Sequence, residues 1–424
     1  MSKFKSSVAV YKDFINLIKS NFDELIFIKF FERVSHSFSI DEDELIDEKD
    51  IASFYFKTNQ RVNFLYDLAL TYSEKYLTED EWTKFEFELA SILKLYHKND
   101  IAIKLFQKII SRETKNPKQK KVLADCYMQV AQIYGSEAKW KEFERSIKVA
   151  GNLYEEINDQ LGEAEYQFVY GSVFLEKGEI EAAKVRFDNV EKYLKNLSNK
   201  LLRAKLDNNL GILNLITGNY SDAKAKLNIA LKAFEELEIL PFQAEVKLNL
   251  GIVTLKLKDF AQALIHFDDT KLLAIRSLSI QNVALSLMYK ANVFIAKNEF
   301  KRAQKIIDQA TTISYHINDN LTVADLFKMS GIIAQNLDKF DLAEDMLLTS
   351  LRINQELNNK LNTAETSIEL ALLYRKLKQY SIALSYAKDA LNYFQKIESE
   401  DIAKDLNILV NSLKYEIERQ NAEG

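Results

Sequence analysis

The chain repeats itself every forty residues, and no other feature restricts its fold as strongly. Alanine returns seven times at this spacing, from Ala124 to Ala364, and seven residues after each stands another small residue. Nine residues further on comes a bulky residue, which is aromatic in six of the seven repeats. The small residues are Ala131, Gly171, Gly211, Gly251, Ala291, Gly331 and Ala371. A period of this length is typical of arrays in which each unit stacks on the next.

Each repeat has the pattern of two amphipathic helices. In the repeat that contains Gly211, apolar residues recur from Leu202 to Ile216 at steps of four, four, three and three. Residues 217–219 form a turn signal, and a second helix is expected from about Ser221 to Leu237. Because one pair cannot bury both of its apolar faces, neighbouring pairs must stack. The sequence therefore predicts an all-α solenoid of antiparallel helix pairs.

Glycine inside a helix needs a reason, because it costs about 1 kcal/mol relative to alanine. Gly211 and Gly251 both lie inside helical patterns. We expect the small side chain to let two helix backbones approach closely, with the bulky residue nine positions later filling the space where they diverge. Burial of that apolar surface then offsets the lost helix propensity.

Composition narrows the class of protein and of partner. The chain has only 2 prolines and 10 glycines, and its net charge of −5 comes from 62 acidic and 57 basic residues mixed along its length. This balance predicts neither a nucleic acid nor an anionic membrane as partner. No apolar run approaches the ~18 residues that span a membrane, and no secretory signal is visible, so a cytoplasmic protein is expected. Cys126 is the single cysteine, which excludes an internal disulfide.

No constellation of residues indicates catalysis. The four histidines stand alone in sequence, without a second histidine or a cysteine at metal-ligand spacing. Phosphate-binding glycine loops, nucleophile elbows and dinucleotide fingerprints are also missing. We expect no enzyme activity, no cofactor and no metal.

The columns of the repeat resemble those of the tetratricopeptide repeat family. Besides the small column, the turn glycines Gly178 and Gly218 and the step from Tyr220 to Ala223 follow the order of that signature. The resemblance covers residues 84–400, about eight repeats, and implies a right-handed superhelix. The forty-residue period is similar to that of kinesin light chains and bacterial Rap-type regulators, whereas thirty-four is usual. Residues 1–83 are then an amino-terminal helical region, and residues 401–424 a capping helix and tail. Within the amino-terminal region, residues 8–34 have one Phe-rich helical pattern, residues 39–50 are expected to form a loop, and Thr78 with Glu81 resembles a capping box.

The resemblance implies a concave groove lined by the first helix of each pair. Asn209 and Asn249 lie two residues before the small column, and an amide there could hold a peptide backbone, since it both donates and accepts hydrogen bonds. The alternative is that both are ordinary solvated helix residues. Near them we predict a largely apolar floor, whose side chains could instead pack on one another. The other predicted site residues are Gln129, Phe168, Ile212, Leu248, Ile252, Met288 and Tyr289.

Carboxylates follow one edge of this predicted groove, including Glu245, Asp325 and Glu365. An acidic edge suits an amphipathic or basic peptide. The leading interpretation is a non-enzymatic scaffold or adaptor that binds a peptide or helix in the groove. The alternative is a Rap-like, peptide-sensing regulator that acts on a response regulator through its amino-terminal helices. A third idea is that residues 1–50, which contain a Phe-rich helix and the acidic stretch 39–50, occupy the groove in the same molecule.

Overall fold

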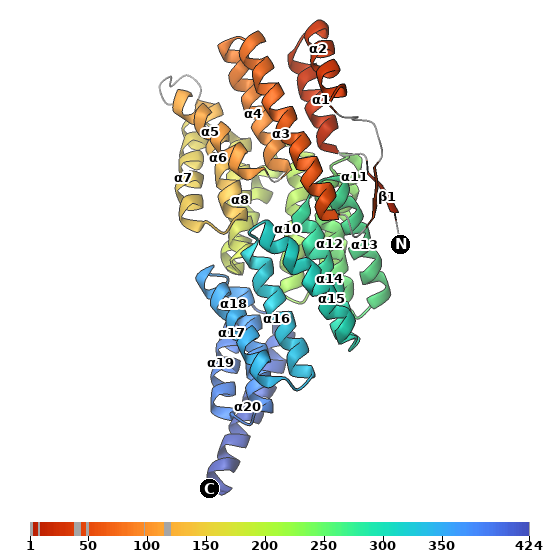
Figure 1. Cartoon of the computed structure of the whole chain (residues 1–424). Coiled ribbons are helices and arrows are strands. Elements are labelled where there is room, and N and C mark those ends of the chain that lie inside the picture. The colour runs from red at the N-terminus through yellow and green to blue at the C-terminus, as the bar shows by residue number, and fades with distance from the viewer. Residues whose placement is uncertain are drawn as a thin grey trace. The chain divides into compact units, whose positions relative to one another are not determined.

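The computed structural model describes residues 3–6, 9–37, 44–47, 51–96, 98–113 and 120–423. These residues form twenty helices and one short pair of strands (Figure 1). The prediction of an all-α chain of consecutive antiparallel helix pairs, as in a solenoid of tetratricopeptide type, is confirmed. Among the described residues, no helix is long and apolar enough to cross a membrane.

The helices gather into two compact units, and each is described by itself. Unit 1 comprises residues 1–166 with 272–280, and unit 2 comprises residues 167–271 with 281–424. The chain boundaries expected from the repeats, after residues 83 and 400, stay predictions. Unit 1 contains β1 (Lys3–Ser6), β2 (Glu44–Asp47), α1 (Ala9–Asn21), α2 (Glu24–Ser35), α3 (Ile51–Tyr76), α4 (Glu79–Leu95), α5 (Asn99–Glu113), α6 (Lys120–Ser136), α7 (Trp140–Glu156) and the start of α8 (Gln160–Glu176).

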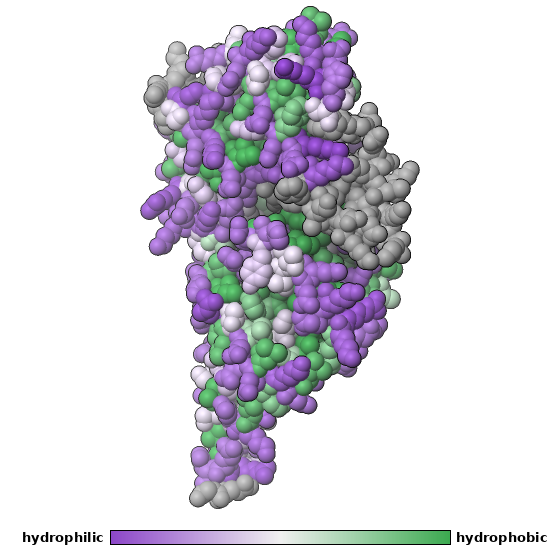
Figure 2. Space-filling model, viewed as in Figure 1, coloured by the Kyte–Doolittle hydropathy of each residue, from purple (hydrophilic) through white to green (hydrophobic). Residues whose placement is uncertain are grey.

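Unit 2 continues from within α8 as a succession of helix pairs. Its further helices are α9 (Ile180–Leu194), α10 (Lys200–Ile216), α11 (Tyr220–Glu236), α12 (Leu240–Lys256), α13 (Phe260–Arg276, to Lys271), α14 (Ile280–Ala296), α15 (Phe300–His316), α16 (Asn320–Asn336), α17 (Phe340–Glu356), α18 (Lys360–Lys376), α19 (Tyr380–Lys396) and α20 (Glu400–Glu423). On the face seen in Figure 2, hydrophilic and hydrophobic side chains are interspersed over α16 to α20, as amphipathic helices require.

The amino-terminal region differs from expectation in two places. The sequence predicts one helix over residues 8–34, but Asp23 ends that run, because its carboxylate accepts a hydrogen bond from the Ile26 amide at 2.9 Å and caps α2. The acidic stretch 39–50 was expected to be a loop, whereas residues 44–47 pair antiparallel with residues 3–6. The predicted capping box at α4 is confirmed: Glu81 accepts hydrogen bonds from the amide and the hydroxyl of Thr78.

Left-handed turns separate the seventeen-residue helices of the array. After α12, Lys258 has φ of +61°, its amide donates to the Leu255 carbonyl, and the Asp259 amide donates to the Thr254 carbonyl. This double hydrogen bond is the Schellman motif, which satisfies the last carbonyls of a helix. Glycine is the residue usually expected there, yet eleven described residues other than glycine have positive φ, all in such turns. The turns are therefore set by hydrogen bonding more than by residue type.

The small column admits a close helix contact, as predicted, and the side chain packed against it is one that the sequence does not single out. A Cβ atom on Gly251 would lie 2.4 Å from Phe267, and one on Gly211 would lie 2.7 Å from Leu227. The residue packed against each glycine is thus sixteen positions later, in the middle of the second helix of the pair. That the residue nine positions later fills the space where the helices diverge stays a prediction. The half-buried Phe260, nine positions after Gly251, stands at the first turn of that helix.

Candidate functional site

The predicted site residues of unit 2 lie on the first helix of successive pairs. Asn209 is on α10, Asn249 on α12 and Tyr289 on α14. We call the surface formed by these helices, with the end of α8 and with α16 and α18, the inner face. Three helix pairs contribute charge to this surface, because the charges of Asp319 and Glu245 both act on Glu176. Gln129 lies on α6 in unit 1, where Lys94 donates a hydrogen bond to its side chain.

The two asparagines take part in a hydrogen-bonded ladder that links α8, α10 and α12. Asn209 donates from Nδ2 to Ser172 Oγ at 2.7 Å, and Asn249 donates from Nδ2 to Asn208 Oδ1 at 3.0 Å. Asn208 in turn donates to Glu245 Oε1 at 2.7 Å. Both predicted amides are 7% exposed, so neither is the solvated helix residue of the alternative interpretation. Their use in binding a peptide stays a prediction. Asn208 takes part in two of these hydrogen bonds. It is not among the predicted site residues, because the forty-residue columns do not distinguish it from its neighbours.

The predicted apolar floor divides into two groups. Leu248 and Met288 are 4% and 3% exposed and belong to clusters between the helix pairs, so they offer almost no surface to a ligand. Packing on neighbouring side chains is the alternative that the sequence left open for them. Phe168, Ile212 and Ile252 are half-buried and keep part of their surface accessible.

Tyr289 belongs to the half-buried group and is held in place by an aromatic contact. Its ring stacks on that of Phe267, with centroids 5.9 Å apart. Burial, with the charges of Asp325 and Glu365, raises the pKa of the Tyr289 hydroxyl. The hydroxyl therefore stays protonated and can donate a hydrogen bond on the inner face.

Carboxylates dominate the electrostatics of the inner face. Lys328 on α16 lies between two of them, with Nζ 3.0 Å from Asp325 and 2.6 Å from Glu365. Burial raises the pKa of Glu245, even though the hydrogen bond from Asn208 opposes the rise. Glu176 reaches solvent, yet the protein around it and the charges of Asp319 and Glu245 raise its pKa to about 8. Such shifts indicate a surface that favours an added positive charge.

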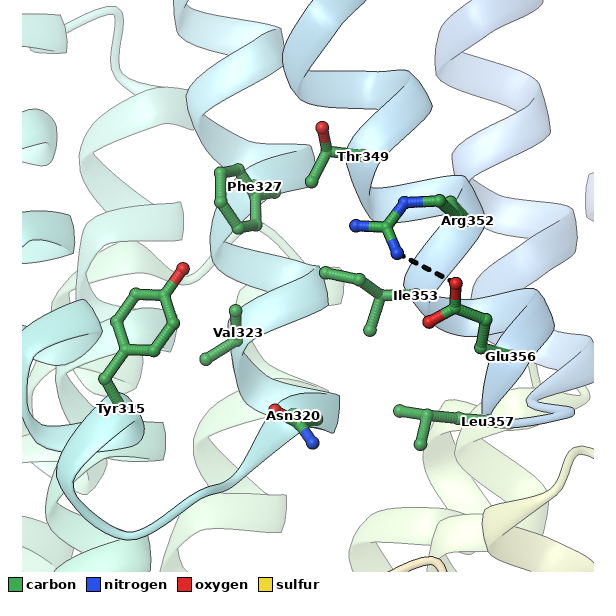
Figure 3. A pocket seen from close by; sticks show the side chains of 9 residues that line it. All are labelled: Tyr315, Asn320, Val323, Phe327, Thr349, Arg352, Ile353, Glu356 and Leu357. Atoms are coloured by element: carbon green, nitrogen blue, oxygen red, sulfur yellow. Dashed lines mark hydrogen bonds and ion pairs between the residues drawn. The ribbon is translucent and has the colours of Figure 1, made fainter.

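A separate open cavity of about 320 Å³ lies among α15, α16 and α17 (Figure 3). Val323, Phe327, Ile353 and Leu357 supply apolar walls. Arg352 and Glu356 form an ion pair at 2.8 Å on the α17 side, and both are more than half exposed. The cavity contains none of the predicted site residues. Its paired charges and apolar walls could accept one apolar side chain of a partner.

The described part of the chain contains no cluster of three or more histidine, cysteine or acidic residues suited to a metal ion. His97 lies outside the described residues. Burial lowers the pKa of His266, which contacts Gln262 within the same helix and has no carboxylate hydrogen-bonded to its ring. His266 therefore lacks the carboxylate partner that orients a histidine acting as a general base.

Comparison with known proteins agrees with the fold. A family model described as tetratricopeptide repeat matches residues 323–396. A solved structure of Rap protein complexed with competence and sporulation factor is 13% identical, covers 80% of this chain and 99% of that chain, and superposes with a TM-score of 0.57. NprR in complex with its cognate peptide NprX is 16% identical, with 69% and 87% covered and a TM-score of 0.51. No curated protein sequence matches the chain. The array is thus tetratricopeptide-like, similar in fold to Rap and NprR.

Proposed function

We propose that the chain is a non-enzymatic, cytoplasmic interaction protein that binds a basic or amphipathic peptide on the inner face. The observation that carries this proposal is the group of carboxylates whose pKa is raised there, Glu176 and Glu245 foremost. A lysine, arginine or amino-terminal ammonium group placed among them would favour their charged forms. The two solved structures of similar fold were each determined with a peptide or factor bound, which supports a peptide as the ligand.

The polar ladder and the half-buried apolar residues would serve the rest of such a peptide. Backbone groups could hydrogen-bond to Tyr289 and to the amides of the ladder, whereas Ile212 and Ile252 would contact an apolar side chain. The acidic surface would also speed the encounter with a basic ligand and make it sensitive to salt.

The test is binding of defined peptides to the full chain. Fluorescein-labelled nonapeptide pools, one rich in lysine and arginine and one rich in glutamate and aspartate, are titrated and followed by fluorescence anisotropy. Glu369, on α18, is a further carboxylate of the inner face whose pKa is raised by burial. We expect only the basic pool to bind, with an affinity that falls at least tenfold in Glu245→Gln with Glu369→Gln. Glu235→Gln, at an exposed position of α11, is the matched control and should leave binding unchanged. Equal binding of both pools, or no loss in the double variant, contradicts the proposal.

A second candidate is the Rap-like regulator that acts on a response regulator. The favouring observation is that α1, α3 and α4 contact one another ahead of the array, as an effector bundle would require. Its test is whether the full chain binds phosphorylated response regulators or changes their rate of dephosphorylation. Occupation of the inner face by residues 1–50 stays a prediction, since most of the acidic stretch 39–50 lies outside the described residues.

A further inference from the structure

Two turns of unit 2 that are far apart in sequence touch each other. The amide of Lys360, at the start of α18, donates to the carbonyl of Lys177, after α8, at 2.9 Å. Asn359 donates from Nδ2 to the Glu176 carbonyl at 3.1 Å across 183 residues of sequence. The hydroxyl of Tyr393, on α19, donates to the Gly178 carbonyl at 2.9 Å. Figure 1 shows the start of α18 beside the end of α8.

Charged side chains reinforce this contact. The ammonium group of Lys360 lies 3.1 Å from Glu179, which also pairs with Lys177 at 3.1 Å. Outside these turns, Lys184 Nζ and a carboxylate oxygen of Glu398 are 3.7 Å apart, with Glu398 largely exposed and Lys184 about one-third exposed. The contact is therefore made of hydrogen bonds and ion pairs between turns. Polar contacts of this kind are individually weak and open more readily than the apolar clusters between neighbouring helix pairs.

The contact between the two turns leaves no room for a side chain at Gly178. Gly178 has φ of +71°, and residues other than glycine have φ of +52° to +61° at equivalent turns, so a left-handed backbone alone does not require glycine. A Cβ atom on Gly178 would lie 2.6 Å from the Leu361 amide nitrogen and 2.8 Å from the Tyr393 hydroxyl. Gly218, at the same position of the next pair with φ of +89°, would meet nothing within 4 Å. Glycine at 178 is thus needed for the approach of α18 and α19.

Asn359 is also fitted to the contact. Its Oδ1 accepts from the Asn362 amide at 2.9 Å and caps α18, which leaves Nδ2 to reach Glu176. Asp319 occupies the same position one repeat earlier and caps α16 with a carboxylate, which has no N–H to donate. The side-chain amide of Asn359 therefore both caps α18 and links it to the end of α8.

We propose that residues 176–179, residues 359–361 and Tyr393 form a clasp whose opening and closing controls access to the inner face. The clasp holds the backbone of Glu176 through the hydrogen bond from Asn359. The Glu176 carboxylate is close enough to Asp319 and Glu245 for their negative charges to act on it. Closing it brings together carboxylates that repel one another, and a cationic ligand between them would favour the closed state. The inference rests on the proposed function in assigning the inner face as the binding surface.

Closure can be measured without any ligand. Nitroxide labels on Lys184→Cys and Glu398→Cys, which flank the clasp, should give one narrow, short distance by pulsed electron paramagnetic resonance. Cys126 is buried, and labelling of the otherwise unchanged chain checks that it does not react. Gly178→Asn should shift at least half of the molecules to longer distances, whereas Gly218→Asn should not. Identical distributions for these two variants, or a long distance in the parent, overturn the proposal.

A second variant removes the clasp without adding bulk. Asn359→Asp keeps the helix cap but loses the donor to Glu176, and Tyr393→Phe loses the donor to Gly178. Together they should lengthen the label distance while far-ultraviolet circular dichroism stays unchanged. Asn199→Asp, which caps α10 in the same way, is the matched control.

Access is read from a thiol on the inner face. Glu369→Cys should react with maleimide at least threefold faster in the Asn359→Asp, Tyr393→Phe background than in the parent. Equal rates show that the clasp does not control access. Because neither readout uses a peptide, failure of peptide binding would count against the proposed function and leave the clasp standing.

Discussion

At the scale of single residues, large and small side chains are matched across each helix pair. Where the small column has glycine, the residue sixteen later is phenylalanine or leucine, as in Gly251 with Phe267. Where it has alanine, the residue sixteen later is smaller or β-branched, as in Ala291 with Ile307. The pair, more than either residue, determines how closely the two helices approach.

Gly251→Ala should lower the free energy of unfolding by about 1–2 kcal/mol, since the clash with Phe267 outweighs the gain in helix propensity. Adding Phe267→Ile should recover most of that loss, because it recreates the Ala291–Ile307 pair. Chemical denaturation of the single and double variants measures both. A stabilised single variant would contradict this account of the column.

Glu176 makes stability depend on pH. Its pKa is raised to about 8 in the folded chain, so the folded state holds its proton while the unfolded state loses it from about pH 4.5 upward. The folded chain is therefore destabilised progressively between those values. Glu176→Gln removes this effect and should raise the melting temperature more at pH 9 than at pH 5. An equal increase at both pH values would show that the carboxyl titrates normally.

At the scale of secondary structure, the elements are nearly uniform: from α6 to α19 the helices have seventeen residues and end in left-handed turns, except α9, which has fifteen and ends without one. The Schellman hydrogen bonds satisfy the end of one helix, and the next helix begins after three intervening residues. A non-glycine residue in the left-handed region carries a steric penalty in most of these turns. Replacing such a residue by glycine should remove the penalty and raise the free energy of unfolding.

Lys258→Gly should raise the free energy of unfolding by about 0.5–1 kcal/mol, since glycine adopts φ of +61° without strain. Lys256→Gly, two residues earlier in the last turn of α12, is the contrasting variant and should lower it. Thermal unfolding followed by circular dichroism compares them. If both substitutions destabilise, the turn is held by contacts of the lysine side chain instead.

At the scale of the whole molecule, repeat arrays gain stability from contacts between neighbouring units, and an uncovered end exposes an apolar surface. Here α20 packs on α19 and buries Leu406, Leu409, Val410 and Leu413. The clasp adds a contact within unit 2 that is not between neighbours. It couples distant repeats in a way that a linear stack lacks.

Ending the chain after Ser399 removes α20 and should lower the melting temperature and cause self-association, because the surface of α19 becomes exposed. Ending it after Gln420 is the control and should change neither property. Light scattering and calorimetry report the two effects. A monomeric, equally stable chain without α20 would show that α20 is no cap.

The sequence alone determined the period, the helix pairs, the all-α class and the resemblance to tetratricopeptide repeats. These follow from local spacing, because apolar periodicity and turn residues act within one repeat. The partner of the small column, the burial of Leu248 and Met288, the ladder through Asn208 and the contact of Gly178 with α18 and α19 needed the tertiary structure. Each depends on how groups from different helices meet, and the hydrogen bond from Tyr393 to Gly178 joins residues 215 positions apart. Periodicity carries no information about which distant turns come together, because that depends on small angles between pairs that accumulate along the array.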